Sequence, residues 1–220
     1  MNRSAKERII SKIVKMEERI VKCNRCKEIR TCCKKPSLGR GDVEATVMVV
    51  FATENDLTKD RMAAAKMREQ LAVMAGNAHT VYHTYMVRCQ PKTCARRKGK
   101  EFLFDGQMIN NDSECMLTNR PCDGKYTQPD DKETMNCLHF LLEEIEILGP
   151  EVIITVGEET YQYVFRAFGL ITPSQKDFTD VNNQVFRTVD HVFIPVNLDF
   201  DENGDAFPAL KEVFKTLFQQ

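Results

Sequence analysis

Apolar residues recur along this chain at two spacings, one typical of helices and the other of buried strands. Residues 4–22 place Ile9, Ile13, Met16 and Ile20 on one face at helical spacing, with Lys and Glu opposite, which predicts an amphipathic helix. Similar stripes predict four more helices, which start near residues 60, 137, 157 and 205.

Continuous apolar runs predict strands that are buried on both faces. They cover residues 46–51, 80–89 and 151–157, and such runs are typical of a parallel sheet. Residues 183–197 predict two more strands around a tight turn at Asp190-His191. Because strands alternate with helices, we expect an α/β fold, a three-layer α/β/α sandwich with a mostly parallel central sheet.

Binding sites in such sheets lie at the carboxyl ends of the strands. In this chain those ends are residues 52–60, 88–92, 157–159 and 197–201. Residues 92–136 lack periodicity and are interpreted as a long insertion. We therefore expect a single domain over residues 23–220, with residues 1–22 as an N-terminal helix that is part of it.

Composition narrows the classes of function. The net charge of −1 over 220 residues excludes a general attraction to DNA or acidic lipid, so any nucleic-acid site needs a local basic patch. No apolar run reaches the length of a membrane span, and the charged N-terminus does not resemble a signal peptide. Nine cysteines without such a signal indicate a reducing, cytoplasmic location.

Four of the cysteines have a pattern that suits a metal centre. Cys23 and Cys26 have the CxxC spacing of metal ligands, Cys89 closes an apolar strand, and Cys137 opens an amphipathic helix. They predict an iron–sulfur cluster or, as the alternative, zinc; ordinary buried thiols are the plainer interpretation of the last two. The spacing of the remaining cysteines, including Cys115, matches no standard site.

Basic residues crowd around the third of these cysteines. They predict contacts with nucleic-acid phosphates, against the simpler interpretation of a solvated loop. The residues are Arg88, Lys92, Arg96, Arg97 and Lys98.

The order of these features resembles the iron–sulfur (family 4) branch of the uracil-DNA glycosylases, from about residue 20 to the C-terminus. A CxxC pair precedes the Gly39-Arg40-Gly41 loop and an apolar strand, and the run Thr84–Pro91 is similar to the family's TNVVKCRPP. A helix opened by Cys137 and a strand ending at Gly157 follow in order. The resemblance implies that fold, a 4Fe-4S cluster on Cys23, Cys26, Cys89 and Cys137, DNA as partner, and a role in DNA repair.

The catalytic motifs depart from that family. Its GEAPG-like loop is replaced by residues 51–56, and its uracil-reading asparagine and histidine fall at Tyr85 and Asn197. By position, the resemblance implies catalytic roles for Glu54, Asp56 and Asn197, and a base pocket of Phe51, Asn55 and Tyr85. A polar turn is the plainer interpretation of residues 54–56, and Tyr85 is expected to plug the pocket, because a phenol cannot copy an amide.

Three hypotheses about function remain from the sequence. The first is a monomeric glycosylase of altered or weak activity that hydrolyses an N-glycosidic bond. The second is an inactive DNA- or RNA-binding module that keeps the fold and the cluster. The third is a zinc-stabilised interaction protein.

Overall fold

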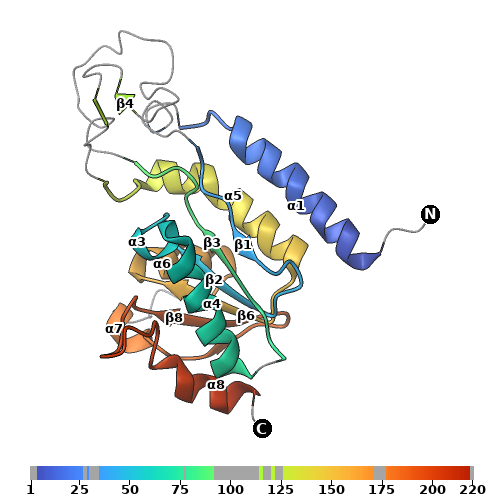
Figure 1. Ribbon diagram of the computed structural model, residues 1–220, viewed down its shortest axis with the longest axis vertical. Coiled ribbons are helices and arrows are strands. Elements are labelled where there is room, and N and C mark those ends of the chain that lie inside the picture. Colours follow the sequence, from blue (N-terminus) through green and yellow to red (C-terminus); the bar gives the residue numbers. More distant parts are fainter. Residues whose placement is uncertain are drawn as a thin grey trace.

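A six-stranded sheet lies at the centre of the computed structural model (Figure 1). The structure describes residues 4–26, 29, 35–76, 78–91, 114–115, 120–121, 126–170 and 177–218. The strand order is β1-β3-β2-β6-β8-β7. The strands are β1 (Arg40–Gly41), β2 (Val47–Phe51), β3 (Val81–Tyr85), β6 (Val152–Val156), β7 (Phe186–Arg187) and β8 (Val192–Val196). The inner four are parallel and the two short edge strands are antiparallel, so the predicted mostly parallel sheet is confirmed.

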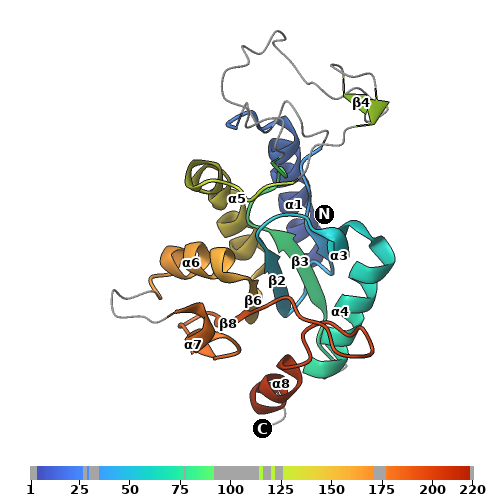
Figure 2. The ribbon, with the colours of Figure 1, turned by 90° about the vertical axis from the view of Figure 1, so that its left-hand side faces the viewer.

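Helices cover both faces of the sheet, which makes the predicted α/β/α sandwich. One face packs against α1 (Ala5–Lys22), α5 (Asp131–Leu148), α6 (Glu158–Ala167) and α7 (Phe178–Val181). The other face packs against α4 (Arg61–Ala75) and α8 (Leu210–Phe218). Figure 2 shows α4 on the opposite side of β2 and β3 from α5 and α6. Neighbouring residues of one strand face opposite cores: Met48 joins the first and Val49 the second.

Side-chain caps fix where the helices begin. The Ser4 hydroxyl accepts a hydrogen bond from the Glu7 amide at the start of α1, and Asp60 caps α4. Asp130 and Glu133 form a capping box at the start of α5, and Gly149 ends that helix in the left-handed conformation. Each cap satisfies backbone groups that the helix itself leaves without partners.

Three predicted boundaries were wrong. The last helix, α8, begins at Leu210 and not near residue 205. Helix α5 begins at Asp131 and not at Cys137, so the last residues assigned to the insertion are helical. Strand β3 ends at Tyr85 and not at Cys89. The amide of Met86 still donates to the carbonyl of Phe51, the last residue of β2, and the amide of Val87 donates to the carbonyl of Ala52. The regular strand is therefore four residues shorter than the apolar run suggested.

Short elements that the sequence did not predict complete the described structure. Helix α3 (Asp56–Lys59) follows β2 within the segment interpreted as a polar turn. Strands β4 (Glu114–Cys115) and β5 (Arg120–Pro121) pair with each other outside the main sheet. Among the helices in the described ranges, none has the length and apolar character needed to cross a membrane.

Candidate active site and cysteine cavity

An open cavity of about 760 Å³ lies where strands β2, β6 and β8 end. Its volume is within the range of small-molecule sites, and carboxyl strand ends are where α/β sheets bind ligands. The segment after β2, the residues before and at the start of α5, and the first turns of α6 form its walls. The lining residues are Phe51, Ala52, Thr53, Asn55, Gln128, Pro129, Asp131, Val156, Gly157, Glu158, Glu159, Gln162, Tyr163, Arg166 and Leu198.

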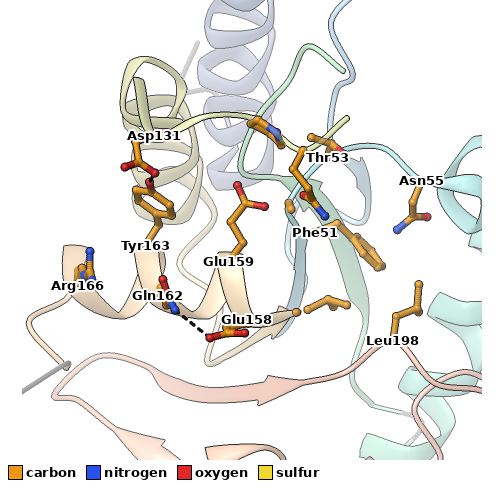
Figure 3. Close-up of a pocket in the computed structure, with 15 residues that line it drawn as sticks. Phe51, Thr53, Asn55, Asp131, Glu158, Glu159, Gln162, Tyr163, Arg166 and Leu198 are labelled. Carbon is orange, nitrogen blue, oxygen red and sulfur yellow. Dashed lines mark hydrogen bonds between the residues drawn. The ribbon is translucent and has the colours of Figure 1, made fainter. Parts of the chain in front are cut away.

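Among the side chains that line this cavity, Glu159 is the one best placed to react with a bound ligand. Figure 3 shows it extending into the space between Tyr163 on one side and Phe51 and Thr53 on the other. Within the described part of the chain, no hydrogen bond or ion pair engages its carboxylate. Partial burial, and to a lesser degree the nearby Asp131, raise the pKa of Glu159 above its ordinary value. A half-buried carboxylate with a raised pKa suits proton transfer.

The other carboxylates of the cavity are held by neighbours. The Tyr163 hydroxyl donates to Asp131 at 2.6 Å, and the Gln162 amide donates to Glu158 at 3.1 Å (Figure 3). Burial and then the bond to Asp131 raise the pKa of Tyr163 to about 12, so the phenol remains a donor at neutral pH. These bonds hold the carboxylates of Asp131 and Glu158, whereas the carboxylate of Glu159 can bind a ligand.

Two of the three residues predicted for a base pocket line this cavity. Phe51 lies at the end of β2 and is only 2% exposed, and Asn55 lies on the same side of the cavity as the N-cap of α3 (Figure 3). The Oδ1 atom of Asn55 accepts from the amide and hydroxyl of Thr58, so Nδ2 is the group that Asn55 can offer to a ligand. Tyr85 is only 1% exposed and packs between Phe51 and His83 in the core, so it does not stand in the cavity.

The residues predicted to be catalytic lie elsewhere. The Asp56 side chain is fully exposed and pairs with Lys59 at 3.5 Å. Asn197 is exposed, and its backbone N–H donates to the side-chain oxygen of Asn182. The next residue, Leu198, lines the cavity. Glu54 lies beside the cavity and contributes its backbone carbonyl, which accepts from the Gln90 amide at 2.7 Å. None of the three is among the described residues that line the cavity.

Sequence reasoning missed Asp131, Glu158, Glu159 and Tyr163. It did identify residues 157–159 as a strand end, which was the available signal for the two glutamates. Asp131 fell inside the presumed insertion, although Asp130 and Glu133 have the spacing of a capping box. The inward direction of Glu159 follows from the path of α6 and has no signature in the sequence.

A second, smaller cavity is lined by all four cysteines that were predicted to bind a metal. Cys23 and Cys26 follow α1, Cys89 follows the end of β3, and Cys137 lies in the second turn of α5. The cavity volume is about 20 Å³, the space of roughly one water molecule. Ile20, Ile29, Val87 and Phe140 supply apolar walls.

Two of these thiols accept hydrogen bonds. The Arg88 amide donates to Cys137 Sγ at 3.3 Å, and the Asn136 side chain donates to Cys26 Sγ at 3.7 Å. Burial raises the pKa of both Cys26 and Cys137 despite these bonds. In the described ranges, no three His, Cys, Asp or Glu side chains are arranged as ligands of one metal ion.

The assignment of Arg88 to phosphate binding was wrong. Arg88 is 1% exposed, and its guanidinium donates to Glu144 at 2.5 Å and to Thr84 at 2.7 Å. Glu144 also accepts from the hydroxyls of Tyr82 and Thr84. Arg88 is therefore part of a buried network beside the cysteine cavity. The other predicted phosphate contacts, Lys92, Arg96, Arg97 and Lys98, lie outside the described residues.

The comparisons with known proteins fit this geometry. A family model described as the uracil DNA glycosylase superfamily matches residues 40–197, well over half of the chain. The match includes every strand of the main sheet, Cys89 and Cys137, and it begins after Cys23 and Cys26. A search among curated proteins found none that matches this chain.

Proposed function

Because the chain belongs to the uracil DNA glycosylase superfamily, we propose that it binds DNA and takes one flipped-out base into the cavity at the ends of β2, β6 and β8. The observation that carries this proposal is the cavity itself. It is open, it has the size of a ligand site, and it lies at the strand ends of a domain from a base-excising superfamily.

In this proposal, Glu159 replaces the carboxylate that the sequence analysis looked for in residues 54–56. A carboxylate at the centre of the cavity can orient a water and accept its proton as the water attacks C1′ of the sugar. It can also stabilise the positive charge that develops on the sugar when the base departs. The raised pKa of Glu159 brings it closer to neutral pH, where such a base is most effective.

The remaining walls are suited to holding a base. Asn55 Nδ2 offers a hydrogen-bond donor on one side of the cavity, and the buried ring of Phe51 packs into the core beneath that side. On the far side, Tyr163 is fixed by its bond to Asp131. Rigid side chains of this kind position a bound group without a large loss of entropy on binding.

We further propose that the four cysteines hold a 4Fe-4S cluster. Four thiols on one cavity, with N–H donors at two sulfurs and an apolar surround, are the donor set that such clusters use. As described, the cavity has space for about one water, so a cluster would have to open it. A cluster would contribute a rigid link between the loop after α1 and helix α5. Zinc remains the alternative occupant.

One observation favours a second candidate, an inactive DNA-binding module. The superfamily's polar readers of uracil are absent: Tyr85 is buried in the core, and Asn197 lies outside the cavity wall. A uracil bound here would leave part of its edge without hydrogen bonds, which lowers the rate of its release. Binding without excision would then be the remaining function of the cavity.

A single-turnover excision assay on the full chain separates the two candidates. Oligonucleotides that carry uracil or hypoxanthine, single- and double-stranded, are incubated with the protein, and abasic sites are cleaved by alkali. If the cavity is catalytic, Glu159→Gln lowers the excision rate by about 10²-fold or more. Glu146→Gln is the matched control, because Glu146 is an exposed residue of α5 away from the cavity.

Catalysis, DNA binding without catalysis, and the iron–sulfur cluster are each tested by a different result. Absence of release from every substrate, with DNA binding retained in both variants, would establish the module and refute catalysis. The cluster is tested separately by the colour and iron content of anaerobically purified protein. Cys23→Ser is expected to remove the visible absorbance, whereas a colourless wild-type protein with one bound zinc would refute the iron–sulfur assignment.

A further inference from the structure

The walls of the base cavity carry more negative than positive charge. Asp131, Glu158 and Glu159 line it, against one guanidinium, Arg166, among the described lining residues. Helices α5 and α6 both begin at the cavity, and each N-terminus adds roughly half a positive charge. The sum is still about one negative charge, in a space where a neutral base would have to leave as an anion.

Anionic departure is the difficulty with uracil in this cavity. When the C1′–N1 bond of a uracil nucleotide breaks, its electron pair stays on the base, which becomes an anion. The carboxylates raise the energy of that anion, and Leu198, at the end of β8, adds an apolar contact and no hydrogen-bond donor. The arrangement therefore opposes the charge that uracil release develops.

We propose that the cavity selects bases that already carry a positive charge, namely N-alkylated purines such as N7-methylguanine and N3-methyladenine. This inference rests on the proposed function of the same site. When the C1′–N9 bond of such a nucleotide breaks, its electron pair neutralises the ring, and a neutral alkylpurine leaves. Water adds its oxygen to C1′ and gives its proton to Glu159 and then to solvent, so the products are the neutral base, an abasic sugar and one proton.

The walls suit a cationic ring in two further ways. The half-buried ring of Tyr163 lines one side of the cavity, and aromatic faces attract cations. The carboxylate of Glu159 extends into the cavity beside it without a described partner, so a cation would supply the opposite charge that it lacks. Both features favour the charged ground state and the positively charged sugar of the transition state.

The test compares bases on one DNA sequence with the full-length protein. Single-turnover release of N7-methylguanine is expected to exceed release of uracil by about ten-fold or more, after subtraction of the spontaneous rate. The preference should decrease as salt is raised, since salt screens exposed charges. Glu158→Gln should lower the ratio by about two- to five-fold, whereas the charge-matched control Glu146→Gln should leave it unchanged.

Two outcomes would overturn the inference, and a binding measurement keeps it testable without turnover. Release of uracil at an equal or higher rate would refute the preference while leaving the proposed excision function intact. If no base is released at all, excision fails, and fluorescence titration with N7-methylguanosine against guanosine decides. Binding of the cationic nucleoside at least about ten-fold more tightly would support the charge selection, and equal binding would refute it.

Discussion

Removing the charge of Glu144 should destabilise this protein more than any other single conservative change in α5. Glu144 is 1% exposed and accepts from Arg88, Thr84 and Tyr82. In Glu144→Gln an amide NH₂ replaces one carboxylate oxygen, although all three neighbours are donors. The guanidinium of Arg88 then stays buried without its counter-charge, and its Nε already lacks a partner among the described residues.

The expected loss is about 3–5 kcal/mol, the usual result of removing one partner from a buried ion pair. A domain of this size is typically stable by about 5–15 kcal/mol, so the variant loses roughly a fifth or more of its stability. The melting temperature should decrease by roughly 6–20 °C. Arg88 also donates its amide to Cys137, so the same variant should bind the proposed cluster less tightly.

Urea unfolding followed by circular dichroism measures the effect, with an unchanged m-value as evidence that the native fold is kept. The neighbouring Glu143→Gln is the control, because Glu143 pairs with Arg19 at the surface and should cost about 0–1 kcal/mol. The double variant Arg88→Met/Glu144→Gln should be more stable than Glu144→Gln alone. A Glu144→Gln variant no less stable than Glu143→Gln would refute the reasoning.

Three further predictions concern the core, an edge strand and the cavity. Burial, followed by Arg68 and Arg40, lowers the pKa of His83 from 6.5 to about 4, so the unfolded chain binds a proton first as the pH falls. Stability should thus decrease between pH 6.5 and 4, by roughly 3 kcal/mol, and His83→Phe should flatten that decrease in urea titrations. Gly41 has a φ of +140°, and an added Cβ would lie 2.4 Å from the Val81 carbonyl oxygen. Gly41→Ala should therefore lower the free energy of unfolding by about 1–3 kcal/mol in urea titrations. The control Ala45→Gly, at a nearby position, should lower it by less than half as much. The folded state raises the pKa of Glu159, so ionisation of this carboxyl opposes folding once the pH exceeds its ordinary pKa, and Glu159→Gln should raise the melting temperature at pH 7, even where it lowers the proposed excision; a lower melting temperature at pH 7 would contradict this sign.

The sequence predicted the parallel strands and most helices because burial on one or both faces of an element requires apolar residues at a regular spacing. Asp60 and the stripe of residues 138–148 are examples, since each places an element boundary or a face without reference to the rest of the chain. The prediction that Arg88 binds phosphate was wrong for the opposite reason. Its position in a basic stretch resembled a surface patch, and its partner Glu144 is distant in sequence, on the buried face of another helix.

The sequence predicted where the candidate site lies, at the strand ends, but not which carboxylate extends into it. Phe51 and Asn55 follow directly from the end of β2, so the strand pattern was enough to find them. Glu159 required the relative position of α6 and the segment after β2, which depends on how the sheet is covered. The positions of such side chains are set by tertiary packing, and the local sequence constrains them weakly.

The packing of α1 on α5 has a consequence for synthesis of the chain. The buried side chains of α1, Ile13, Met16 and Ile20, are covered in the finished fold by elements that include α5. Roughly 125 residues separate the end of α1 from the end of α5, and at about 5–20 residues per second these take roughly 6–25 s to translate. During that time the apolar face of α1 and the first two cysteines have no α5 to cover them on the nascent chain. Chaperone binding to the first 22 residues is therefore expected to protect the protein until its own helix α5 is made.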